Sequence, residues 1–301
     1  HGQSPTPQST PQRTPDPSWE RQRAIEQNNN RRLEAMRMKN AVNTRETTQN
    51  VVQNIESIYR KPTSKERKLL APNPEDLKKF DEFLGKSDTG IIKLVPDFGC
   101  AANPNVIVAS PDCLKYSMPG AGSSYSFRVN NYRIQRLADL TYTKNSFQAI
   151  GILLHGILVD IGDVSLEQVS LDTKGLKFLI DFIPTEDYKK GREIDREFLQ
   201  GIKKEGFLYS RAVAAKENTT YILRSVAYRG KSYRAVQGLT YDEFDFDKRK
   251  DIIVAFRIIR TDEDGSITIL WKELESKKSP TIKKTNQTKP DIEENKFVTE
   301  K

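Results

Sequence analysis

The longest apolar run in the chain, at residues 150–159, is the feature that most constrains its fold. Ile, Leu and Val make up most of the run, and only Gly151, His155 and Gly156 interrupt it. It is about half as long as the roughly 20 apolar residues that a membrane-spanning helix needs. Branched side chains favour strands, and internal glycines weaken a helix. The run therefore predicts a buried β-strand at the centre of a core, and no transmembrane segment is expected.

Basic charge is concentrated at the two ends of the chain. Residues 1–70 hold 13 Lys and Arg against 7 Asp and Glu, and residues 276–301 hold 7 against 4. The stretch between them holds 29 against 30, so its net charge is close to zero. A folded domain that grips nucleic acid usually carries a basic face of its own. This distribution disfavours nucleic-acid binding by the domain, and only the basic extensions remain as candidates for such binding.

The amino end has the composition of a spacer in an exported protein. It opens without Met and is rich in Pro, Ser, Thr and Gln, which is typical of a chain that follows a cleavage point. Cys100 and Cys113 lie in a stretch rich in Pro, Asn and Asp. In an oxidising compartment they are predicted to form a disulfide, with two free thiols as the alternative. We therefore expect a secreted protein, periplasmic or extracellular.

Four segments follow from the composition. A Pro-rich disordered leader is predicted at 1–17, a polar helical arm at 18–72, a globular domain at 73–275 and a basic flexible tail at 276–301. The arm is rich in helix formers, but its apolar stripe is thin. Such a helix must pack against another surface, or its ends will unfold.

The pattern within the domain predicts a single α+β fold, a mostly antiparallel sheet with two or three packed helices. The clearest helix is at 73–85, where Asn73 can cap the amino end, and a second is expected from about 184 to 206. Strands are expected at 91–95, 105–109, 125–129, 137–143, 176–183, 207–214 and 220–228. Arg229-Gly230 predicts a hairpin turn into 231–236. The strongest hairpin signal joins 251–260 to 266–274 through Asp264-Gly265, with the first of these strands inside the sheet.

Catalytic and cofactor motifs find little support. Asp97-Phe98-Gly99 lacks the remaining kinase signatures, and Gly230-Lys231-Ser232 lacks the first glycine of a phosphate-binding loop. Two cysteines and two histidines are too few for a structural zinc site, so no metal or cofactor is expected. The weak catalytic candidates are Asp160, Asp163 and His155. The histidine could act as a general base beside these carboxylates. The alternatives are a core imidazole and two turn-capping carboxylates.

Alternating aromatic and basic residues mark a candidate binding face. The set is Tyr221, Arg224, Tyr228, Arg229, Tyr233 and Arg234. On one exposed sheet face these side chains could stack single-stranded nucleic acid or sugars. The alternative is ordinary strand composition, because aromatic residues favour strands.

The sequence favours a non-enzymatic function. We expect an exported protein-interaction or structural subunit, whose arm and domain contact other protein subunits or a second copy of the chain. The reason is the length of chain outside the core together with the missing catalytic set. Two alternatives stay open: a secreted carboxylate-dependent hydrolase or carbohydrate-active domain, and nucleic-acid binding through the basic extensions.

Overall fold

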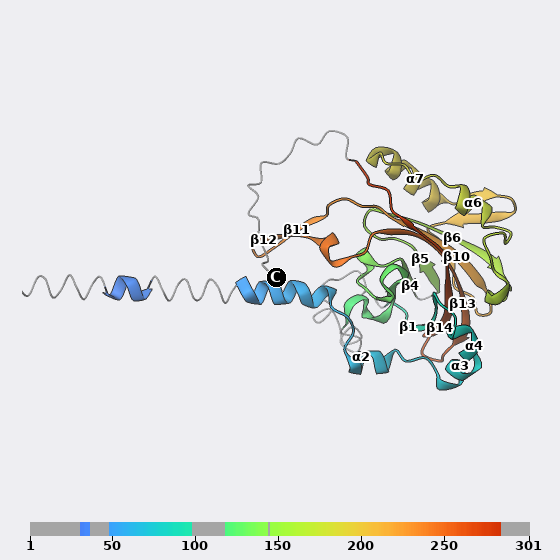
Figure 1. The fold of residues 1–301 in the computed structure, drawn as a ribbon, viewed down its shortest axis with the longest axis horizontal. Coiled ribbons are helices and arrows are strands. Elements are labelled where there is room, and N and C mark those ends of the chain that lie inside the picture. The colour runs from blue at the N-terminus through green and yellow to red at the C-terminus, as the bar shows by residue number, and fades with distance from the viewer. Residues whose placement is uncertain (1–30, 37–47, 98–117, 144, 284–301) are drawn as a thin grey trace, which may run out of the picture. The chain divides into compact units, whose positions relative to one another are not determined.

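The computed structural model describes residues 31–36, 48–97, 118–143 and 145–283 (Figure 1). The chain divides into two compact units, His1–Asn54 and Ile55–Lys301. In the first unit, residues 31–36 are helical, and a helix over 48–59 spans the boundary. The predicted leader, the strand at 105–109 and the proposed disulfide between Cys100 and Cys113 lie outside the described residues.

A seven-stranded sheet forms the centre of the second unit. Every strand pair in it is antiparallel, and the order is β1-β14-β13-β10-β6-β8-β7. Its strands are β1 (Thr89–Leu94), β6 (Leu154–Gly162), β7 (Ile202–Lys204), β8 (Phe207–Ser210), β10 (Thr220–Ala227), β13 (Lys250–Thr261) and β14 (Ile267–Lys278). This confirms the α+β fold. The predicted hairpin is β13–β14, and β13 lies inside the sheet between β14 and β10.

A smaller five-stranded sheet covers one face of the main sheet. It consists of β2 (Ser124–Ser126), β3 (Asn131–Tyr132), β4 (Leu140–Thr143), β5 (Ser146–Gln148) and β9 (Ala212–Ala214), in the order β3-β2-β4-β5-β9. Phe147 of β5 is fully buried, and its ring packs edge-on against Tyr221 of β10 and Phe256 of β13, at centroid distances of 5.3 and 5.0 Å. These aromatic contacts join the two sheets.

Short helices cover the opposite face (Figure 1). They are α3 (Pro74–Lys79), α4 (Asp81–Leu84), α6 (Lys177–Asp181) and α7 (Tyr188–Gln200), while α2 (Ser64–Leu69) precedes α3. Alternate side chains of β10 serve the two faces, since Tyr221 faces the small sheet and Ile222 packs with Leu179 of α6 and Phe198 of α7. The central strands are therefore buried on both sides.

The apolar run at 150–159 forms the buried strand that its composition predicts. Ile157, Leu158 and Val159 are completely buried in β6, between β10 and β8. Gly156 is needed there, because a Cβ at this position would lie 2.3 Å from the Cβ of Ala149. The glycine therefore marks a close approach between the central strand and the chain leaving β5.

The helix predicted at 73–85 forms as two short helices. Asn73 caps the first through its side-chain oxygen, which accepts a hydrogen bond of 2.9 Å from the backbone N–H of Glu75. The chain leaves helical geometry at Phe80, which ends α3 and begins α4. Asp76 of α3 pairs with Arg260 of β13 at 2.6 Å, so α3 is fixed to the sheet by an ion pair.

The strand predicted at 176–183 is wrong, because residues 177–181 form α6. The reason is a distant residue. The guanidinium of Arg224 donates hydrogen bonds to the carbonyl oxygens of Leu179 and Phe182, which a helix end leaves without backbone partners. The second predicted helix also ends earlier than expected, at Gln200, where Gly201 takes a φ of 88° and the chain turns into β7.

The hairpin predicted at Arg229-Gly230 is also wrong. Strand β10 pairs with β6 and β13, while β11 (Tyr233–Val236) pairs with β12 (Leu239–Asp242) as a separate two-stranded sheet. The backbone of Arg229 instead pairs with residues near the end of the described chain, donating to Pro280 and accepting from Ile282. Residues 279–283 therefore form a strap across the domain.

The compact unit extends beyond the boundaries expected for the domain. Residues 55–72, placed in the arm by composition, belong to it, and β14 continues to Lys278. Tyr59 shows how the earlier residues are held. Its ring stacks on Phe246 at 4.4 Å, and its hydroxyl donates a hydrogen bond of 3.2 Å to the buried carboxylate of Glu243.

A buried network of four charges links the small sheet to the segment before β13. Asp139 accepts hydrogen bonds from Nε of Arg128 at 2.6 Å and from the hydroxyl of Ser225 at 2.5 Å. Arg128 also donates to Asp247 at 2.7 Å, and Asp247 accepts from Arg249 at 2.9 Å. The Arg128, Asp139 and Asp247 side chains are completely buried. The two positive and two negative charges therefore neutralise one another in the protein interior, where a single unpaired charge would be strongly destabilising.

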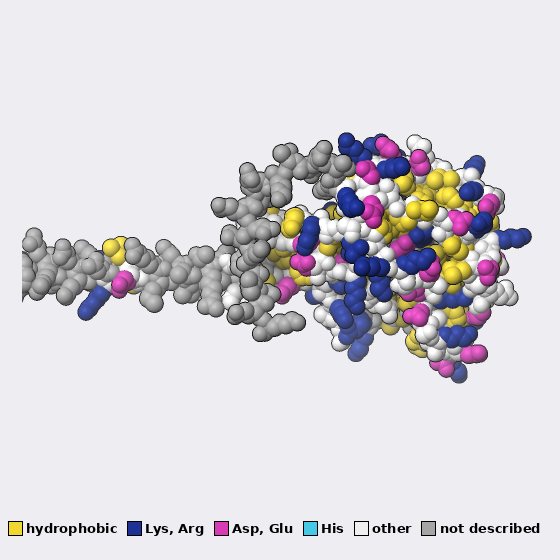
Figure 2. All heavy atoms as spheres, turned by 45° about the horizontal axis from the view of Figure 1, so that its top comes forward, with side chains coloured by type: hydrophobic (Ala, Val, Ile, Leu, Met, Phe, Trp, Pro, Cys, Tyr) yellow, Lys and Arg dark blue, Asp and Glu magenta, His cyan; other side chains and the backbone are white. Residues whose placement is uncertain are grey.

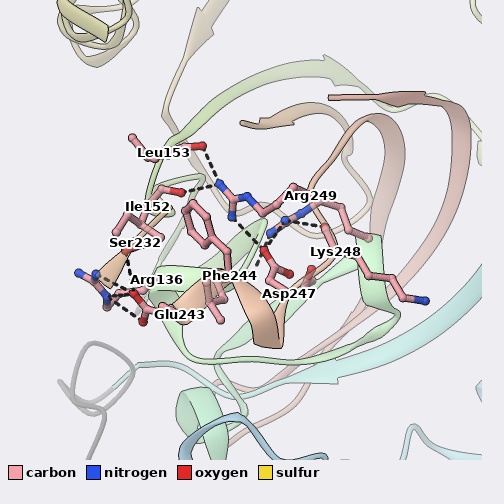
Figure 3. Close-up of polar contacts among 12 residues, drawn as sticks. Arg136, Ile152, Leu153, Ser232, Glu243, Phe244, Asp247, Lys248 and Arg249 are labelled. Carbon is pink, nitrogen blue, oxygen red and sulfur yellow. Dashed lines mark hydrogen bonds and ion pairs between the residues drawn. The ribbon is translucent and has the colours of Figure 1, made fainter. Parts of the chain in front are cut away.

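The arginines of this network stay charged for different reasons. Burial opposes the charge of Arg128, but Asp139 and Asp247 together raise its pKa. Burial and the neighbouring Arg128 charge lower the pKa of Arg249 to about 10, which still leaves it protonated at neutral pH. Figure 3 shows the Arg249 guanidinium directed at the carbonyl oxygens of Ile152 and Leu153, at 2.8 and 2.7 Å. The network thus also holds the start of the apolar run.

We predict that Asp139→Asn lowers the free energy of unfolding by about 3 kcal/mol or more. The change leaves the buried Arg128 with one carboxylate partner in place of two, and breaking a buried pair typically costs 3–5 kcal/mol. Equilibrium urea unfolding measures it. Asp172→Asn, at an exposed carboxylate, is the matched control and should change stability by about 0.5 kcal/mol or less. Equal effects of the two substitutions would contradict the role given to the network.

Candidate functional site

The structure does not bring His155 together with Asp160 or Asp163. His155 is near the start of β6, and Asp160 lies five residues along the strand, roughly 16 Å away at strand rise, on its other face. Asp160 accepts a hydrogen bond of 2.8 Å from the backbone N–H of Gly162 and pairs with Lys216 at 3.4 Å. Asp163 pairs with Arg257 at 2.6 Å. Both carboxylates therefore have structural partners at the end of β6.

His155 instead pairs with Asp195 of α7. The Nδ1 atom lies 2.7 Å from a carboxylate oxygen of Asp195, and the imidazole is 3% exposed. Its ring meets the rings of Tyr228 and Phe182 edge-on, at centroid distances of 4.9 and 6.2 Å. Because a carboxylate can only accept, Nδ1 carries a proton and donates it to Asp195.

A cavity of about 410 Å³ lies beside this pair. One wall is a face of α7, and the others come from the segment before β6, from Tyr228 and from the strap. The lining residues are Gly151, Ile152, Leu153, Leu154, His155, Tyr188, Gly191, Arg192, Asp195, Arg196, Leu199, Arg211, Tyr228 and Ile282. The α7 residues among them recur at helical spacing, so one face of the helix forms the wall.

Several buried polar atoms in this cavity wall have no hydrogen-bond partner among the described residues. They are Nε2 of His155, Nε of Arg211 and the hydroxyl of Tyr228. Burial, followed by the charges of Asp195 and Asp251, raises the pKa of Tyr228, so its hydroxyl stays protonated at neutral pH. A buried polar group without a partner typically costs about 1–3 kcal/mol. Three such groups around one cavity make it the candidate site of the domain.

The candidate aromatic and basic residues do not form one exposed face. Tyr221, Arg224 and Tyr228 are at most 3% exposed, and each belongs to the interior. Arg229 donates to the carbonyl of Ser279 in the strap, while Arg234 lies 3.5 Å from Glu243. Arg229 and Tyr233 are the exposed members of the set, and Tyr233 is 65% exposed on β11. Of this set, only Tyr228 lines the cavity.

Sequence reasoning found His155 and Tyr228 but missed Asp195 and Arg211. Asp195 is one of several charged residues in α7, and nothing in its spacing sets it apart from Glu193 or Glu197. It reaches His155 because α7 packs across β6, 40 residues away in the chain. The sequence signal nearest to the site is Gly191, because a glycine inside a polar helix often has a packing or functional reason.

Comparisons with protein-family models, curated proteins and solved structures found no match for this chain. In the part of the chain that the structure describes, no helix is long and apolar enough to cross a membrane. Nor does any group of three or more His, Cys, Asp and Glu side chains within the described ranges gather closely enough to hold a metal ion. The site must therefore be interpreted from its own geometry.

We predict that Gly191→Ala raises the melting temperature by about 1–4 °C. A Cβ at this position would lie 3.4 Å from Nε2 of His155 and 3.5 Å from Ile282, which are ordinary contacts. Replacing a helix-interior glycine by alanine gains about 0.5–1 kcal/mol, and a domain of this size gains about 2–4 °C per kcal/mol. Calorimetry measures the shift.

Gly206→Ala provides the control for this substitution. Nothing lies within 4 Å of a Cβ at position 206, but Gly206 has a φ of 84°, so alanine there is strained and should lower the melting temperature. A fall at position 191 as large as that at 206 would show that α7 does not pack on His155 as described.

Proposed function

We propose that the chain is an exported, non-enzymatic subunit that binds other protein subunits through its arm and through one edge of its domain. The supporting observation is the position of its exposed apolar side chains. Large apolar residues that are more than half exposed occur, among the described residues, at Leu33 and Met36 in the arm and at Ile183, Leu199 and Tyr233 in the domain. Both regions named in the proposal therefore carry uncovered apolar surface.

The arm carries its apolar side chains on one side of a helix. Leu33 and Met36 are three residues apart, which places them on the same face, and they are 56% and 60% exposed. The other described residues of this segment are polar apart from Ala35. A six-residue polar helix has little stability of its own in water. Contact of Leu33 and Met36 with a partner would supply the stability that the isolated helix lacks.

Two of the exposed apolar side chains of the domain lie beside the edge strand β7. Leu199, at the end of α7, is 71% exposed, and Leu208 of β8, next to β7, is 49% exposed. Gly201 follows Leu199 by two residues, and a Cβ on Gly201 would lie 2.9 Å from Leu208, so Leu208 lies beside the turn that ends α7. Figure 2 shows hydrophobic side chains at the surface of the domain, interspersed with charged ones. An edge strand beside apolar residues is a surface to which other chains bind.

The alternatives receive less support from the structure. A carboxylate-dependent hydrolase was suggested through Asp160 and Asp163, yet these carboxylates bind the Gly162 backbone and Arg257. Nucleic-acid binding was suggested through the basic extensions, most of which lie outside the described residues. The subunit proposal is supported by described side chains in both of the regions it requires.

We predict that the mass of the native particle falls when the arm loses its apolar face. The tagged full chain would be recovered from its native cells without denaturant, and light scattering would give its absolute mass. The wild type should exceed the 34.4 kDa of one chain, and the double variant Leu33→Asp with Met36→Asp should approach that value. Charged side chains at these positions would have to be desolvated in the interface, at a cost of several kcal/mol.

Matched controls separate contact from charge. Ala35→Asp places the same charge on the other side of the arm helix and should leave the particle intact. Leu199→Asp tests the domain edge, and its neighbour Gln200→Asp is its control, since both positions are exposed. A wild-type mass of 34.4 kDa, or a particle that survives Leu33→Asp, Met36→Asp and Leu199→Asp together, would refute the proposal.

A further inference from the structure

The cavity beside α7 carries more positive than negative side chains. Arg192 and Arg196 lie one turn apart on α7 and both line it, together with Arg211 from the segment between β8 and β9. Neither Arg192 nor Arg196 makes an ion pair with any described residue. The one carboxylate of the wall, Asp195, is engaged by His155 at 2.7 Å and lies 3.8 Å from Arg211. Three arginines thus line the cavity, of which Arg192 and Arg196 are exposed, against one carboxylate that is already paired.

The floor of the cavity supplies hydrogen-bonding groups that no described residue satisfies. Tyr228 is 1% exposed and His155 is 3% exposed, and the Tyr228 hydroxyl and the Nε2 atom of His155 both lack a partner. The Nε atom of Arg211 also lacks a hydrogen-bond partner among the described residues. Because buried polar groups are almost always paired in proteins, a cluster of unpaired ones at a cavity marks a place where a ligand can supply the missing bonds.

The remaining wall of the cavity is apolar, and the strap forms part of it. The apolar side chains are those of Leu153, Leu199 and Ile282. The backbone of Ile282 donates a hydrogen bond of 3.1 Å to Arg229, and that of Lys283 donates one of 2.7 Å to Glu186. These bonds tie the strap to the end of β10 and to the segment before α7. The resulting volume of about 410 Å³ suits a small organic molecule.

We propose that this cavity binds a small organic anion that carries a carboxylate or a phosphate group. Arg192 and Arg196 bind its charged group, because the planar guanidinium donates two parallel hydrogen bonds to either group. Tyr228 and Arg211 hold its polar atoms, and Leu153, Leu199 and Ile282 cover its apolar part. This proposal does not depend on the subunit contacts proposed above, although Leu199 belongs to both surfaces.

Thermal unfolding of the full chain tests the site directly. Sodium benzoate and sodium phosphate serve as probes of the carboxylate and the phosphate, and sodium chloride at equal ionic strength is the reference. At a concentration a hundredfold above Kd, a bound anion should raise the melting temperature by about 5 °C or more over the chloride reference. A saturable rise with benzoate assigns a carboxylate ligand, and one with phosphate assigns a phosphate ligand.

Variants of α7 decide whether the rise comes from this cavity. The double variant Arg192→Gln with Arg196→Gln should lose it, while Lys189→Gln, an exposed cation of α7 that does not line the cavity, should keep it. Gly191→Ala, which fills the space beside His155 with ordinary contacts, should weaken binding at least threefold without loss of the fold. The proposal is overturned if neither probe gives a saturable rise up to about 100 mM, or if the rise persists in the Arg192 and Arg196 double variant.

Discussion

The burial of β6, β10 and β13 on both faces is the constraint on which the rest of this structure depends. Ile157, Leu223 and Val254 are completely buried, so each of these strands needs a layer above it and a layer below it. The small sheet supplies one layer and the short helices the other (Figure 1). Helices as short as α3, α4 and α6 have little stability alone, and they form because the sheet offers them an apolar surface.

Buried charges fix how these layers meet. The network around Asp139 and Asp247 joins the small sheet to the entry of β13, and Arg224 joins the main sheet to the end of α6. Glu243, completely buried, accepts hydrogen bonds from Arg136 (Figure 3) and from Tyr59, and so holds the beginning of the compact unit. The His155–Asp195 pair joins β6 to α7 in the same manner, but with polar atoms left over on the cavity side. What distinguishes the candidate site is that three such atoms border one cavity, whereas the Asp247 network has a single one and lines neither described cavity.

Local patterns predicted the parts of the fold that local chemistry decides. The Asp264-Gly265 turn between two apolar strands predicted β13–β14, and Asn73 predicted the start of α3. The same method misassigned α6, because an apolar run at 176–183 suits a buried strand equally well until Arg224 caps its carbonyls. It missed Asp195 for a related reason, since its partner His155 is 40 residues away. Long-range pairing is a property of the packed layers, and one sequence carries no periodicity that reports it.

The proposed partner contacts lie at residues 31–36 of the arm and in the segment that runs from the end of α7 through β7 to β8. Hydrogen–deuterium exchange by mass spectrometry tests both together. The native particle would be compared with the same chain separated from its partners by dilution. The account predicts that backbone amides at 31–36 and at 199–208 exchange more slowly in the particle, while those of β13 are unchanged. Equal exchange in both states at residues 31–36 and at residues 199–208 would contradict it.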